Sequence, residues 1–153
     1  MPDDERGRRP RAVVWVRDPS PPPGDPRRAL LSRLRELATE GPLGDLSVRS
    51  WGRFVDASPP EAGADRPIRA RIAEFYEWAD RSGHSLAPAF RRCERSTMLA
   101  PSGTEVIRLP LVCVAMYDDD RLVGVFPCST DGETNTVPEC VDRLERGDTP
   151  TRP

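Results

Sequence analysis

The clearest hydrophobic pattern lies between Thr104 and Ser129, where two apolar runs flank three consecutive aspartates. The first run is rich in Val, Leu and Ile, and the second reads LVGVF. Apolar runs joined by a short polar turn are typical of a β-hairpin whose strands are largely buried. The pattern therefore predicts a folded sheet protein with a hairpin turn at residues 118–120, and the turn explains the aspartates without a bound cation.

Alternation along the first arm of this hairpin predicts two distinct faces. Odd-numbered residues from Ile107 to Tyr117, including Leu111, share one face. Pro110 cannot donate a hydrogen bond to a neighbouring strand, so it marks an edge or a bulge. A further strand around residues 93–99 is expected to pair with this arm.

Two helices are predicted earlier in the chain from apolar residues at spacings of three and four. Asp25 and Pro26 provide an N-terminal cap and a first residue for one helix, which ends at Gly41. The second helix is expected from Asp65 or Arg66 to Ser82, with Gly83 in a left-handed cap.

A third, short helix is predicted near the end of the chain, where Thr136 and Glu139 form a capping box. Strands are expected at residues 12–17 and 46–51. The resulting order βαβα-βββ-α predicts an α+β fold with a mixed β-sheet and helices packed mainly on one face. We expect a flexible basic arm at residues 1–11, a single domain at 12–146 and a disordered tail at 147–153.

The charges divide the chain unevenly. Its 153 residues have a net charge of -2, all basic residues are arginine, and residues 1–35 carry a net positive charge while the rest is acidic. The guanidinium group of arginine is planar and can donate paired hydrogen bonds to a phosphate or a carboxylate. The length suits one hydrophobic core.

Residues 66–95 form a candidate helix-turn-helix. In this interpretation Ser85 caps a short second helix that runs to Arg92, and Arg91, Arg92 and Arg95 contact DNA from the major groove. Pro88 is tolerated only in the first turn of such a helix. The alternative is a helix followed by a loop that leads into a strand, with the arginines in solvent.

The basic arm is a second candidate for nucleic-acid contact. Arg6, Arg8, Arg9 and Arg11 resemble arms that enter a minor groove or follow phosphates. The alternative is an inert, solvated tail.

Other chemistry is not indicated. His84 is the single histidine, and no GxSxG elbow, CxxC pair or glycine-rich phosphate loop occurs. Pairing of His84 with Cys93, or a metal cluster of Cys93, Cys113 and Cys128, remains the alternative. Cys113 and Cys140 are expected in the core and Cys128 at the surface. We therefore expect no enzyme activity, metal or cofactor.

No apolar stretch is long enough to span a membrane, and no apolar segment follows the first charged residues. The expected location is the cytoplasm, without membrane association.

As an ordered set, four motifs resemble those of small haloarchaeal proteins that carry a domain described as helix-turn-helix. They are RAVVWVRD, VRSWGRFV, IAEFYEWADRSGHSLAPAFRR and LPLVCVAMYDDDRLVGVFPCSTDGETNTVPECVDRLE. The resemblance implies a DNA-binding or regulatory role without cofactor or catalytic residue.

Together these observations predict a protein that binds double-stranded DNA and regulates transcription, and a homodimer is a further expectation. The alternative is a non-catalytic binding or dimerisation module without a nucleic-acid role.

Overall fold

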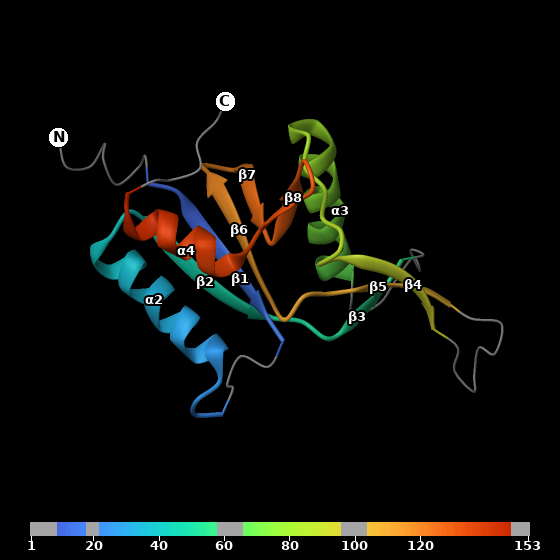
Figure 1. Ribbon diagram of the computed structural model, residues 1–153, viewed down its shortest axis with the longest axis horizontal. Helices are drawn as coiled ribbons and strands as arrows, with labels where there is room; N and C mark the ends of the chain where they lie inside the picture. Colours follow the sequence, from blue (N-terminus) through green and yellow to red (C-terminus); the bar gives the residue numbers. More distant parts are fainter. Residues whose placement is uncertain (1–8, 18–21, 58–65, 96–103, 148–153) are drawn as a thin grey trace.

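The computed structural model describes residues 9–17, 22–57, 66–95 and 104–147 (Figure 1). Its centre is a four-stranded mixed sheet in the order β2-β1-β6-β7. The strands span β1 Arg11–Val16, β2 Asp45–Ser50, β6 Val112–Asp118 and β7 Arg121–Phe126. β1 is parallel to β2 and antiparallel to β6, so Val14 lies between Val48 and Val114. Helix α2 (Pro26–Glu40) makes the crossover between the two parallel strands.

A second, three-stranded antiparallel sheet has the order β3-β5-β4. Its strands are β3 Phe54–Asp56, β4 Arg91–Arg95 and β5 Thr104–Arg108. This sheet lies at the opposite end of the protein from α2 (Figure 1). A two-stranded sheet of β8 (Cys128–Thr130) and β9 (Glu133–Asn135) leads into α4 (Val137–Glu145).

Both faces of β1 and β6 are buried because these two central strands carry apolar residues at successive positions. Ala12, Val14 and Val16 face α2 and α4, whereas Val13 and Trp15 face α3 (Arg66–Ser82). The predicted α+β class is confirmed. Of the described helices, α2 and α4 share one face and α3 covers the other.

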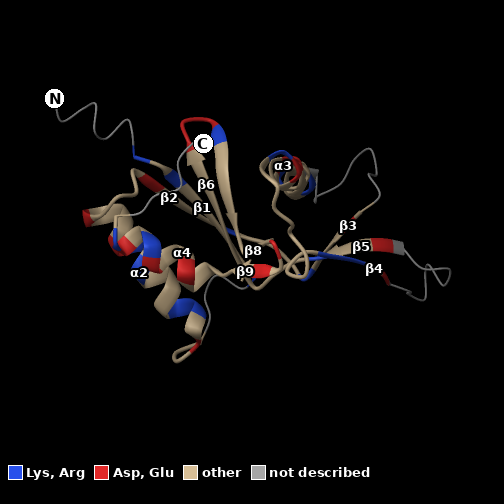
Figure 2. Ribbon diagram, turned by 45° about the horizontal axis from the view of Figure 1, so that its top comes forward, with Lys and Arg blue, Asp and Glu red and all other residues tan. Residues whose placement is uncertain are grey.

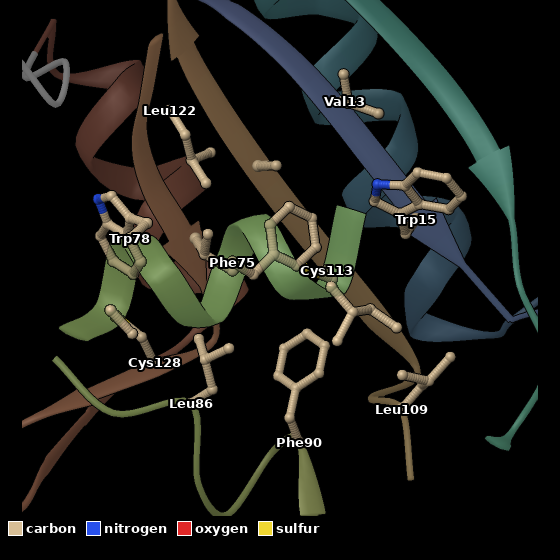
Figure 3. Packing of buried hydrophobic residues seen from close by; sticks show 14 of the residues in the cluster. Val13, Trp15, Phe75, Trp78, Leu86, Phe90, Leu109, Cys113, Leu122 and Cys128 are labelled. Atoms are coloured by element: carbon tan, nitrogen blue, oxygen red, sulfur yellow. The ribbon is translucent and has the colours of Figure 1, made fainter. Parts of the chain in front are cut away.

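The core under α3 is rich in aromatic rings (Figure 3). Trp15 stacks on Trp51 with ring centroids 5.5 Å apart. Phe90 makes edge contacts with Trp51 at 5.9 Å and with Phe75 at 6.2 Å. Offset and edge-to-face contacts of this kind add to the stabilisation that burial provides.

The predicted helix caps are confirmed. Asp25 Oδ1 accepts a hydrogen bond from the amide of Arg27 at 2.9 Å, and Gly83 has φ of 74°. Thr136 and Glu139 form the capping box of α4. Arg33 of α2 then joins the two helices through an ion pair with Asp142 at 2.6 Å. These ends form as predicted because the capping groups are local in sequence.

The first arm of the predicted hairpin is divided at Pro110. β5 ends before this proline and belongs to the three-stranded sheet, whereas β6 begins after it and belongs to the central sheet. The carbonyl of Pro110 accepts a hydrogen bond from Nε1 of Trp51 at 3.1 Å. Leu111 is 44% exposed, whereas the other odd-numbered residues predicted to share its face are buried. The turn after Asp118 is confirmed, with Asp119 at φ of 55°.

Two further predictions require correction. Arg11 begins β1 rather than ending a mobile arm, because it pairs in register with Asp45 and Tyr117. Cys128 is 3% exposed rather than at the surface, because β8 brings it into the core beneath α3. The rest of the predicted arm up to residue 8, and of the tail from residue 148, lies outside the described residues.

Candidate nucleic-acid interface

The second helix of the predicted helix-turn-helix is not formed. Residues 84–90 make a loop and a turn, and β4 begins at Arg91. Ser85, predicted to cap a helix, accepts a hydrogen bond from the amide of Ala87 at 3.2 Å within the loop. The alternative interpretation, a helix followed by a loop that leads into a strand, is the one that the structure supports.

Long-range contacts explain why this segment is not helical. The backbone of Ser85 forms two hydrogen bonds with Ser129, at 2.8 and 2.7 Å, so it is part of a β-bridge. Leu86 and Phe90 are each 2% exposed and anchor the loop in the core. Pro88 has no amide hydrogen to donate to a helix. The segment therefore buries its apolar residues instead of presenting a helix to solvent.

The predicted contact residues Arg91, Arg92 and Arg95 all lie in β4. Figure 2 shows basic residues along this strand, away from α2. Successive residues of a strand point to opposite faces of its sheet, so Arg91 and Arg92 are separated. The side chain of Arg95 lies outside the description.

Arg91 lies on the outer face of the three-stranded sheet. It pairs directly with Arg108 of β5, which in turn pairs with Phe54 of β3. Arg91 and Arg108 are both exposed. Ile107 precedes Arg108 in β5 and is buried in the core on the other face of the sheet. Arg91 and Arg108 make no ion pair with any described residue.

Arg92 lies on the opposite face and is engaged there. Its Nη1 forms an ion pair with Oε1 of Glu105 at 3.1 Å. Its guanidinium carbon lies 5.9 Å from the centre of the Tyr76 ring. Burial raises the pKa of Tyr76, and the positive charge of Arg92 partly opposes that shift.

Two more arginines extend the positive charge beside Arg108. Arg17 follows β1 and donates a hydrogen bond to the carbonyl of Leu109. The pKa of Arg17 is lowered, first by burial and then by repulsion from Arg53, Arg108 and Arg27. Arg27 has a carboxylate partner in Asp25, 2.7 Å away. We define the arginine cluster as Arg17, Arg53, Arg91 and Arg108.

The described end of the predicted arm lies at the start of β1, whereas Arg17 of the cluster follows the same strand. Arg9 is exposed just before β1, and the guanidinium of Arg11 lies 4.5 Å from the centre of the Tyr117 ring. Arg6 and Arg8 lie outside the described residues. Arg11 is therefore held against the central sheet rather than free in an arm.

His84 and the cysteines take structural positions. Nδ1 of His84 lies 2.6 Å from Oγ1 of Thr130, and its ring stacks on Trp78 at 4.9 Å. Cys113 and Cys140 are buried as predicted, and burial raises the pKa of Cys140 to about 12. Among the described residues, no three His, Cys, Asp or Glu side chains are placed to hold a metal ion.

Sequence reasoning missed Arg17, Arg53 and Arg108. Arg108 had only a partial signal, because the strand predicted to pair with its arm was placed at residues 93–99, which left Arg91 in the predicted second helix. Arg17 and Arg53 gave none. The carbonyl of Arg53 accepts a hydrogen bond from the amide of Leu109, and the side chain of Arg17 donates one to the carbonyl of Leu109, so distant contacts place both arginines. No helix in the described part of the chain is long and apolar enough to cross a membrane.

A family model described as a helix-turn-helix domain matches residues 4–149, which include every element of the fold. No curated protein and no solved structure matches the chain.

Proposed function

Because the chain belongs to the helix-turn-helix domain family, we propose that it binds double-stranded DNA, and that the arginine cluster is the contact surface. The observation that carries this proposal is the pairing of Arg91 with Arg108 across β4 and β5. The proposal replaces a recognition helix at residues 85–92 with an antiparallel sheet.

Two like charges at directly opposed positions of a sheet destabilise it. Arg53 and Arg108 both repel the positive charge of the nearby Arg17. Among the described residues of β3, β4 and β5, Asp56 is the acidic residue on this face. It lies opposite Val106 rather than opposite an arginine of the cluster. A polyanion would offset this repulsion, because each arginine would then meet a phosphate and release a counterion from the DNA.

The shape of the surface supports the same partner. A two-stranded antiparallel ribbon fits the major groove of B-form DNA, and some DNA-binding proteins use strands in this way. The three-stranded sheet lies at the opposite end of the protein from α2, and Arg91 and Arg108 are exposed on its outer face (Figures 1 and 2). Arg91 and Arg108 would contact phosphates or guanine edges. A regulatory role follows from the proposal if one of them reads a base.

The test is fluorescence anisotropy of a labelled duplex with the full chain at several salt concentrations. The informative variant is Arg91→Gln combined with Arg108→Gln. Its matched control is Arg28→Gln combined with Arg35→Gln, which removes the same charge from exposed positions of α2 at the other end of the protein. We expect the first variant to bind about tenfold or more weakly, with a slope of log affinity against log salt that is smaller by about two.

The control should bind DNA nearly as the native chain does, and circular dichroism should show all three proteins folded. Equal weakening in both double variants would show a nonspecific effect of net charge and would exclude the arginine cluster. If the native chain does not bind duplex DNA even at low salt, the function is wrong and the alternative of a binding or dimerisation module takes its place.

A further inference from the structure

A cavity of about 500 Å³ lies between the first half of α3 and the face of the central sheet formed by β2, β1 and β6. This α3 cavity is separate from the arginine cluster and shares no residue with it. Its volume falls within the range of small-molecule sites in proteins.

Three arginines line the α3 cavity, namely Arg11, Arg49 and Arg71, against the two acids Glu74 and Asp120. Glu74 already has two partners. It accepts a hydrogen bond from the hydroxyl of Tyr117 at 2.7 Å, and it forms an ion pair with Arg71 at 3.3 Å. Arg11 and Arg49 form no ion pair with a described residue.

The stacking of Arg11 on the Tyr117 ring fixes one guanidinium at the wall. Arg49 approaches from β2, directly beside Trp15 in the parallel register. Planar guanidinium groups hold carboxylate or phosphate through paired hydrogen bonds. The wall of the cavity near the sheet therefore carries two cations, Arg49 beside Trp15 and Arg11 over Tyr117, either of which can pair with an oxyanion.

Trp15 supplies the second, independent observation. It lines the cavity and is 6% exposed, yet its Nε1 has no hydrogen-bond partner among the described residues. The nitrogen lies at the edge of the ring turned towards Val13, which also lines the cavity (Figure 3). A buried donor without an acceptor costs about 1–3 kcal/mol. An acceptor on a bound molecule would remove that cost.

We infer that the α3 cavity binds a small organic anion. Its carboxylate or phosphate pairs with Arg49, one of its acceptor atoms takes the hydrogen bond of the neighbouring Trp15 Nε1, and Arg11 adds positive charge to the same wall. Val13 and Pro67 contact the apolar part of the ligand. The inference stands apart from DNA binding, because the α3 cavity shares no residue with the arginine cluster.

The test is isothermal titration calorimetry of the full chain with two anionic probes, benzoate and adenosine 5′-monophosphate. Their neutral counterparts, benzamide and adenosine, are the ligand controls. Two variants address the site. Arg49→Met removes an exposed cation, and Trp15→Phe keeps a ring while removing the indole donor. Arg35→Met on α2 is the matched protein control.

We expect at least one anion to bind with a Kd below about 1 mM and its neutral counterpart to bind about tenfold more weakly. Arg49→Met and Trp15→Phe should each weaken that anion by about tenfold, and Arg35→Met should not. Benzoate and the nucleotide distinguish a carboxylate from a phosphate preference. The Arg91→Gln, Arg108→Gln variant should bind the anion as the native chain does.

Three results would overturn the inference: no binding of either anion up to about 10 mM, equal binding of the neutral probes, or loss of anion binding in the Arg91→Gln, Arg108→Gln variant alone. The side chain of Arg49 is exposed, so Arg49→Met should fold and should still test the inference even if Trp15→Phe does not fold.

Discussion

The hydroxyl of Tyr117 donates a hydrogen bond to Oε1 of Glu74 over 2.7 Å and thereby joins β6 to α3. Tyr117 is 4% exposed, so folding removes most of its contact with water. A buried hydroxyl needs a partner to offset that loss. Glu74 lies one turn after Arg71 on α3, and the ion pair between these two residues holds its carboxylate in place to accept.

Replacement of Tyr117 by Phe is expected to lower the free energy of unfolding by about 1 kcal/mol, because the hydrogen bond is lost and the ring is kept. Urea denaturation followed by circular dichroism measures the change. Glu74→Gln is the control and should cost less, since its amide oxygen still accepts. No change in Tyr117→Phe would mean that this bond does not stabilise the fold.

The same tyrosine predicts a loss of stability in alkali. Burial, followed by the hydrogen bond and charge of Glu74, raises the pKa of Tyr117 from 10.0 to about 12. The folded state then holds the proton more tightly than the unfolded state does, so stability falls as pH rises from about 10 to about 12. Urea midpoints between these pH values should decline more in the native chain than in Tyr117→Phe. Parallel declines would contradict the assignment.

Phe90 is expected to be a major contributor to stability even though it lies in a loop. It is 2% exposed and contacts Trp51, Phe75 and Tyr76. Phe90→Ala should therefore lower the free energy of unfolding by about 3–5 kcal/mol, as for other buried aromatic residues. Phe90→Leu should lose clearly less. A loss below about 1 kcal/mol in the alanine variant is what an exposed recognition helix would give instead.

Of the four cysteines, Cys93 should react first with a thiol reagent in the folded protein. Cys93 is partly exposed, whereas Cys113, Cys128 and Cys140 are buried and burial raises their pKa values. Burial limits access of the reagent, and the raised pKa depletes the reactive thiolate. Ellman's reagent should label one thiol rapidly in the native chain and none in Cys93→Ser. Rapid labelling of a second thiol in the folded Cys93→Ser variant would show that a buried cysteine is accessible.

Predictions from the sequence held where the determining contacts are local. The capping box of Thr136 and Glu139 spans four consecutive residues, and α4 begins there. Alternation along β6 also fixed its faces, with Cys113 towards α3 and Val114 towards α2 and α4. In both cases the pattern within one element decides the outcome.

Predictions failed where a distant partner decides the structure. Residues 85–92 contain a helix start signal, but the backbone of Ser85 pairs with Ser129 instead. Pro110 was recognised as a break, yet only the packing of Trp51 shows that the chain changes sheets there. The α3 cavity could not be predicted, because Arg11, Arg49 and Arg71 come together from three separate elements.

The central position of β1 also sets the order in which the domain can be completed. β1 pairs with β6, whose first residue is Val112, and one of its faces is covered by α4, which ends at Glu145. During synthesis, β1 can therefore complete its pairing with β6 and its packing against α4 only after most of the described domain has been made. Such distant pairings slow folding and leave apolar strands exposed until α4 has been made.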